Sequence, residues 1–87
     1  MATVWIPPLL QDVTAGENRL VVPGSTVREI ISVLDTDFPG IASRLCEDGR
    51  LRPGISVVVD GMVSTTGLRH PLSEGSEIHF LPALSGG

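Results

Sequence analysis

The segment FLPALSGG at residues 80–87 contains two consecutive glycines, Gly86 and Gly87. Glycine loses more conformational freedom on ordering than any other residue, and it has no side chain to pack. The pair therefore adds nothing to a hydrophobic core, and any function that it has must come from its main-chain atoms. A backbone without Cβ atoms can approach another protein closely, so the chemistry to consider is that of the chain end at Gly87.

The side chains that usually carry out catalysis or bind metals form no constellation in this sequence. His70 and His79 lie in different segments and lack the spacing of metal ligands. Cys46 has no evident activating partner, and neither Ser25 nor Ser85 has a paired histidine and acid. We therefore expect a protein that is not an enzyme, with no metal site and no cofactor bound by the chain itself.

Length and composition predict one small intracellular domain. The chain has 87 residues, of which 41% are hydrophobic and 18% charged, which suits a single core. One cysteine excludes an intramolecular disulfide, a multi-cysteine zinc site and a four-cysteine iron–sulfur cluster. We see neither a signal peptide nor an apolar run of about 20 residues, and we expect a cytoplasmic protein that does not enter a membrane.

The charged residues argue against nucleic acid as a partner. Ten acidic and six basic side chains give a net charge of −4, and the basic residues form no cluster. All six basic residues are arginine. Chance in a short chain can explain this composition; alternatively, the absence of lysine protects a chain end that becomes electrophilic during function. The arginines are Arg19, Arg28, Arg44, Arg50, Arg52 and Arg69.

The first half of the chain predicts a hairpin followed by a helix. Residues 3–7 and 18–24 are rich in β-branched or aromatic side chains, and prolines stop both segments. The segment STVREIISVLDTDF then has apolar residues at helical spacing. Thr26 followed by Glu29 has the form of a capping box, so we expect the helix to begin near residue 26.

The second half predicts a short helix and three more strands. Residues 39–49 can form a second helix that is ended by a glycine. Residues 55–63 predict a strand, an Asp-Gly turn and a short return strand. Residues 76–82 alternate in polarity as a strand does, with a proline at the end.

This order of elements predicts an α+β domain of the β-grasp, or ubiquitin-like, class. We expect a mixed sheet of four to five strands, covered by one main helix plus a short second helix. The single domain should comprise residues 1–82, and residues 83–87 should form a flexible tail.

Strand alternation separates the side chains of the predicted sheet into two faces. One set should meet the helix, and the other should lie on the opposite face. That second set is half apolar, and an exposed apolar patch with a polar rim often marks a protein interface. We therefore predict a partner-binding face, unless loops cover it. Its residues are Trp5, Val21, Val58, His79 and Leu81.

The chain resembles the bacterial β-grasp sulfur carriers of the MoaD/ThiS family. The similarity spans nearly the whole chain, and its specific parts are the Asp-Gly turn, the run LSEGSE at residues 72–77 and the tail LPALSGG at residues 81–87. The middle segment and the tail look closer to the cysteine-pathway (CysO-type) and molybdopterin-type carriers than to the shorter thiamine type.

The resemblance implies chemistry at Gly87. In this family an E1-like enzyme uses ATP to adenylate the terminal carboxylate, and a sulfur donor converts the adenylate to a thiocarboxylate. The implied partners are that activating enzyme, a sulfur-accepting biosynthetic enzyme and, in the cysteine pathway, a zinc peptidase of the JAMM type. The tail, Ala83, Leu84, Ser85, Gly86 and Gly87, would thread into a partner's active site.

Two other functions remain compatible with the sequence. The chain could be a ubiquitin-like modifier that is conjugated to proteins through Gly87. It could also be a β-grasp interaction module that binds non-covalently through the Trp5 face. The sequence does not distinguish cysteine, molybdopterin, thiamine or a sulfur-containing secondary metabolite as the destination of the sulfur.

Overall fold

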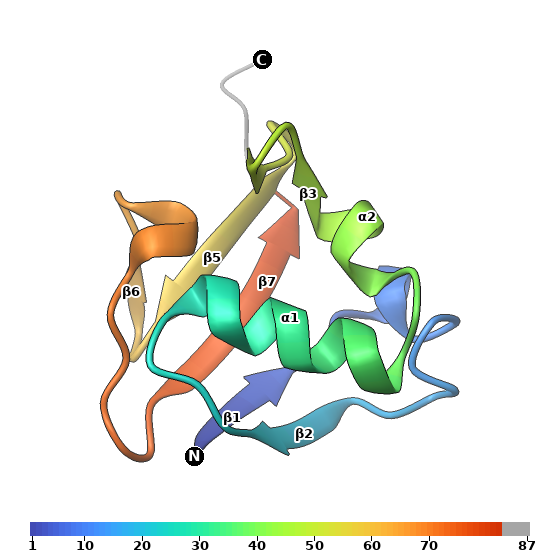
Figure 1. Cartoon of the computed structure of the whole chain (residues 1–87), viewed down its shortest axis with the longest axis horizontal. Helices are drawn as coiled ribbons and strands as arrows, with labels where there is room; N and C mark the ends of the chain where they lie inside the picture. The colour runs from blue at the N-terminus through green and yellow to red at the C-terminus, as the bar shows by residue number, and fades with distance from the viewer. Residues whose placement is uncertain (83–87) are drawn as a thin grey trace.

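A five-stranded sheet carries one long helix across one of its faces (Figure 1). The computed structural model describes residues 1–82, and Ala83–Gly87, the expected tail, lie outside the described residues. The strands are β1 (Ala2–Trp5), β2 (Arg19–Val22), β3 (Cys46–Glu47), β4 (Arg50–Leu51), β5 (Ile55–Val59), β6 (Met62–Val63) and β7 (Glu77–Pro82). The helices are α1 (Val27–Asp37) and α2 (Ile41–Leu45), with 3-10 turns η1 (Pro8–Leu10) and η2 (Gly67–Arg69).

The sheet is mixed, with the strand order β2-β1-β7-β5-β6. β1 pairs with β7 in parallel, while the pairs β1–β2, β5–β7 and β5–β6 are antiparallel. The last strand in the chain is thus the central strand of the sheet. This arrangement confirms the predicted α+β, β-grasp architecture with five strands, a main helix and a short second helix. No helix within residues 1–82 has the length and apolar character needed to cross a membrane.

The start of α1 follows the predicted cap with one difference. The Thr26 side chain accepts a hydrogen bond from the Glu29 backbone N–H at 3.2 Å. In the usual capping box the glutamate accepts from the N-cap residue, but here the Glu29 carboxylate accepts from the Ser25 N–H at 2.8 Å. That hydrogen bond lowers the pKa of the Glu29 carboxyl.

The core lies between α1 and the sheet. Val27, Ile30, Ile31 and Leu34 of α1 are all buried, so the helical stripe seen in the sequence faces inward. The predicted inward residues of the strands meet it, with two of them partly rather than fully buried. The strand residues are Val4, Ile6, Leu20, Val22, Ile55, Val57, Val59, Ile78 and Phe80.

The prediction of one helix over residues 39–49 was wrong in its second half. α2 ends at Leu45, and β3 and β4 then form a small hairpin, with Cys46 opposite Leu51 and Glu47 opposite Arg50. The turn between them is Asp48-Gly49, and both residues have positive φ angles of 54° and 76°. Two successive left-handed residues favour a tight hairpin, so the Asp-Gly pair starts a return strand instead of ending a helix.

The second Asp-Gly turn connects three parts of the fold. Asp60 and Gly61 have φ angles of 50° and 85° and join β5 to β6. The Asp60 carboxylate accepts hydrogen bonds from the buried Ser76 hydroxyl at 3.1 Å and from the Glu77 N–H at 2.9 Å. The turn therefore holds the start of β7 and connects the Asp-Gly pair to the end of the run LSEGSE.

We predict that Asp60→Ala lowers the free energy of unfolding by about 1–2 kcal/mol, because two hydrogen bonds to a charged acceptor are lost and the left-handed conformation becomes strained. Asp60→Asn should cost less, since asparagine tolerates that conformation and keeps one acceptor oxygen. Urea unfolding of the three proteins measures both effects. Equal stabilities for the alanine variant and the parent would contradict the role of this turn.

The pH dependence of stability should include a contribution from Glu29. Its pKa is lowered in the folded protein, so the stabilisation is complete above the ordinary glutamate pKa of about 4.3 and is lost as the pH falls below it. Glu29→Gln should therefore be less stable than the parent at neutral pH, and the difference should shrink in acid. Urea unfolding of the parent and the variant at neutral pH and in acid measures this difference, and an equal difference at the two pH values would contradict the role of Glu29.

Candidate functional site

The open face of the sheet, opposite α1, holds the residues that the sequence placed there. Trp5, Val58 and His79 are half-buried, while Val21 and Leu81 are 50% and 43% exposed. The predicted alternation is therefore correct, and the described residues leave this surface open to solvent. Its use as a partner-binding face stays a prediction.

One row of paired residues crosses all five strands on this face. In the sheet register, Trp5 of β1 lies opposite Arg19 of β2 and His79 of β7. Val58 of β5 continues the row from His79 to Val63 of β6. The row begins with the charged Arg19, continues through the aromatic rings of Trp5 and His79, and ends with two valines. Different parts of this one surface can therefore contact charged, aromatic and aliphatic side chains of a partner.

Trp5 is held on three sides. Its ring stacks on the His79 ring with centroids 5.7 Å apart and planes 7° apart. The Arg19 guanidinium carbon lies 5.8 Å from the ring centroid, within the range of a cation–π contact. The indole N–H donates to a Glu77 carboxylate oxygen at 3.2 Å. These contacts fix the orientation of the largest side chain on the face before any partner arrives.

The apolar part of the face lies beside this aromatic pair. Leu81 of β7 is opposite Ser56 of β5, and Val63 at the sheet edge is 66% exposed. An aromatic centre with aliphatic neighbours and polar groups at the rim is typical of a protein-binding surface.

Sequence reasoning missed two residues that shape this site. Glu77 orients the indole, and Val63 extends the apolar end of the row. Glu77 lies two residues before His79, so strand alternation already places it on this face. Val63 gave no comparable signal, because the pairing of so short a return strand depends on the turn before it.

The chemistry predicted for Gly87 and for the tail Ala83, Leu84, Ser85 and Gly86 falls outside the described residues. The structure does place the residue that precedes the tail. Pro82 pairs with Ile55 at the end of the central strand. The described part of the chain therefore ends within the sheet, on its central strand.

The two histidines have separate structural roles. His79 stacks on Trp5, whereas the His70 ring nitrogen Nδ1 lies 2.7 Å from the Ser64 hydroxyl. Among residues 1–82, no three histidine, cysteine, aspartate or glutamate side chains gather as a metal site.

Comparison with known proteins shows a family that covers most of this chain. The family model described as "ThiS family" matches residues 8–87. The sulfur carrier protein CysO of Mycobacterium tuberculosis is 30% identical over 90 residues, which cover 98% of this chain and 97% of that protein. The small archaeal modifier protein 3 of Haloferax volcanii is 31% identical over 65 residues, with 72% of this chain and 71% of that protein covered.

The fold comparison agrees with the sequence comparison. A chain in the crystal structure of the BexX/CysO complex of Amycolatopsis orientalis superimposes with a TM-score of 0.91 at 34% identity, and each chain is covered completely. The protein described here is therefore a member of the ThiS family, with the ubiquitin-like β-grasp fold of the CysO-type proteins.

Proposed function

We propose that this protein is a sulfur carrier whose C-terminal Gly87 is converted to a thiocarboxylate. The observation that carries the proposal is the similarity, along almost the full length of both chains, to a protein named as a sulfur carrier. Three residues separate the Gly86-Gly87 pair from Pro82, the last residue of the central strand. Catalysis belongs to partner enzymes, and the carrier acts as their protein co-substrate in the cytoplasm.

The proposed chemistry is two substitutions at the chain end. An oxygen of the Gly87 carboxylate attacks the α-phosphorus of ATP, and pyrophosphate leaves. Hydrosulfide then attacks the carbonyl carbon of the acyl-adenylate, the bond to the AMP oxygen breaks, and AMP leaves. The product is a thiocarboxylate, and no oxidant or reductant is needed. ATP binds to the activating enzyme, and the carrier supplies only the carboxylate.

Three kinds of partner follow from this function. An E1-like enzyme activates Gly87, and a biosynthetic enzyme accepts the sulfur. If the biosynthetic product is formed while attached to the chain end, a JAMM-type zinc peptidase releases it from the carrier. The crystallised complex of a CysO with BexX supports the expectation that such carriers form protein complexes.

We predict that incubation with ATP, a sulfide source and the E1-like enzyme from the same genome raises the intact mass by the difference between one sulfur and one oxygen. The shift should disappear when Gly87 is deleted, because the activated carboxylate is then displaced. Gly86→Ala should reduce conversion strongly while the thermal midpoint stays unchanged, since an added Cβ obstructs a narrow channel without touching the core. An unchanged mass with an active cognate enzyme would rule out the carrier function.

A second candidate function is conjugation to other proteins. The relative named small archaeal modifier protein 3 favours it, and both functions begin with activation of Gly87. Covalent adducts of the tagged protein in a denatured lysate, lost with Gly87, would support the modifier. A thiocarboxylate without adducts would support the carrier.

We propose further that the Trp5 face docks the activating enzyme. Trp5→Glu should weaken binding by at least about tenfold, which corresponds to about 1.4 kcal/mol, because a held aromatic side chain at the centre of an interface contributes most to binding. Titration calorimetry against the enzyme measures the loss. Circular dichroism checks that the half-buried position tolerates the change.

Met62→Glu is the matched control. Met62 is 73% exposed and pairs with Val59, whose side chain faces the core, so it lies off the Trp5 face. This variant should bind as the parent does. Binding by Trp5→Glu at parental affinity would show that the enzyme docks elsewhere.

A further inference from the structure

The arginines divide into two groups by their contacts. Arg44 pairs with Asp12 at 3.2 Å, Arg52 pairs with Glu47 at 2.7 Å, and Arg19 lies over Trp5. The second group is Arg28, Arg50 and Arg69. None of these three pairs with a carboxylate within residues 1–82, and all three are exposed. In an acidic protein, half of the basic residues thus share one location.

These three arginines line one open groove of about 520 Å³. Arg28 comes from α1, Arg50 from β4 and Arg69 from η2, so the fold brings them together from distant parts of the chain. Among residues 1–82, no acidic side chain lines the groove, and Glu47, which lies beside it, is already paired with Arg52. The other lining residues are Gly49, Leu51, Thr65, Thr66, Gly67 and Leu68. Asp48, at the turn between β3 and β4, also borders Arg50.

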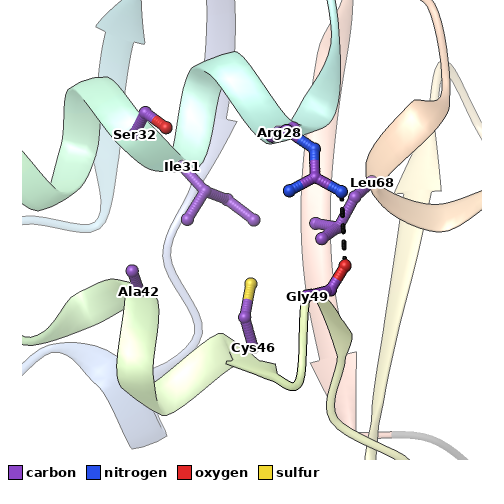
Figure 2. Close-up of a pocket in the computed structure, with 7 residues that line it drawn as sticks. All are labelled: Arg28, Ile31, Ser32, Ala42, Cys46, Gly49 and Leu68. Atoms are coloured by element: carbon purple, nitrogen blue, oxygen red, sulfur yellow. Dashed lines mark hydrogen bonds between the residues drawn. The ribbon is translucent and has the colours of Figure 1, made fainter.

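A small apolar pocket adjoins the groove (Figure 2). It has a volume of about 190 Å³ and is lined by Ile31, Ala42, Cys46 and Leu68, with Ser32 at its edge. The two hollows share three residues: Arg28, Gly49 and Leu68.

Arg28 forms the boundary between the two hollows. Its guanidinium donates to the Gly49 carbonyl oxygen at 3.2 Å, and Figure 2 shows this bond joining α1 to the β3–β4 turn. The pocket is smaller than the roughly 300–1,000 Å³ of sites for drug-sized ligands. Its size suits a single aliphatic side chain, whereas the arginine groove suits the carboxylates of neighbouring residues.

We propose that this groove binds an acidic segment of a partner protein. One aliphatic side chain of the segment enters the adjoining apolar pocket, which Cys46 lines, and its carboxylates bind the guanidinium groups of Arg28, Arg50 and Arg69. Arginine recognises carboxylates with two parallel hydrogen bonds. The apolar anchor supplies most of the affinity, because exposed ion pairs are individually weak and act mainly on association rate and specificity.

The groove includes Arg28 of α1, and α1 crosses the face of the sheet (Figure 1) that is opposite the Trp5 face. The groove is nevertheless connected to the end of the central strand. Its lining residue Leu51 is followed by Arg52, whose carbonyl oxygen accepts a hydrogen bond from the Ile55 N–H, and Ile55 pairs with Pro82. A partner that receives the tail can thus reach the groove, while the Trp5 face stays free. This inference rests on the proposed carrier function, because that function requires the protein to bind partner proteins.

The test uses a capped peptide, acetyl-Glu-Glu-Leu-Asp-Glu-amide, and the protein's one cysteine as reporter. The peptide's leucine should cover Cys46 and slow its alkylation by iodoacetamide at least about threefold near saturation. Burial raises the pKa of the Cys46 thiol, so the reaction is followed by intact mass at mildly alkaline pH. A peptide with Gln and Asn in place of the acids should protect much less, and high salt should remove the difference between the two.

The double variant Arg50→Gln/Arg69→Gln should lose this protection. Its alkylation rate without peptide is measured alongside, so that protection is expressed as the ratio of the rates with and without peptide for each variant. Arg44→Gln, which changes an arginine outside the groove, should keep the protection. Thermal midpoints confirm that each variant is folded.

Three results would overturn the proposal: no protection by the acidic peptide, equal protection by the neutral peptide, or full protection in the double variant. Inorganic phosphate provides a further comparison. If it shifts the amide resonances of Arg50 and Gly67 while the peptide does not, the groove is a site for small oxyanions. The assay involves no sulfur transfer, so its failure leaves the thiocarboxylate test unaffected.

Discussion

The pairing of β7 on both of its edges is the constraint on which the rest of the structure depends. One edge pairs in parallel with β1 and the other antiparallel with β5, so the last strand of the chain joins the first strand to the β5–β6 hairpin in one sheet. Ile78 and Phe80 then enter the core at 0% and 1% exposure, while His79 and Leu81 face outward. Core, open face and the starting point of the tail are thereby fixed by one strand.

The Asp60-Gly61 turn connects the start of β7 both to the β5–β6 hairpin and to the open face of the sheet. Its carboxylate holds Ser76 and the backbone of Glu77, and the Glu77 side chain in turn accepts from the Trp5 indole. A short polar network therefore connects the β5–β6 hairpin to the orientation of the central aromatic on the open face. This explains why a motif that looks like a simple turn in the sequence also matters for the candidate site.

Much of the fold could be predicted because its signals are local. The apolar period of α1, its Thr26 cap and the alternation in β7 each follow from a few neighbouring residues. The β3–β4 hairpin was missed because the Asp48-Gly49 pair is compatible with a helix end as well as with a turn. Both readings satisfy the local rules, and only packing against α1 and η2 decides between them.

The candidate surfaces depend on contacts that no local pattern contains. The stacking of Trp5 on His79 requires the parallel register of two strands from opposite ends of the chain. The arginine groove likewise requires α1, β4 and η2 to meet. The three arginines are far apart in the sequence and form no basic run. The sequence alone therefore did not predict that they share one surface of the folded protein.

The parallel pairing of β1 and β7 also separates the two ends of the sheet. Thr3 lies opposite Glu77, so Pro82 is five residues farther along the central strand, or about 17 Å at the usual rise of a β-strand. Met1 lies beyond Thr3 in the other direction and is held by Glu74. A fusion partner, a purification tag or a surface linker joined ahead of Met1 would therefore be attached at the end of the sheet away from Pro82.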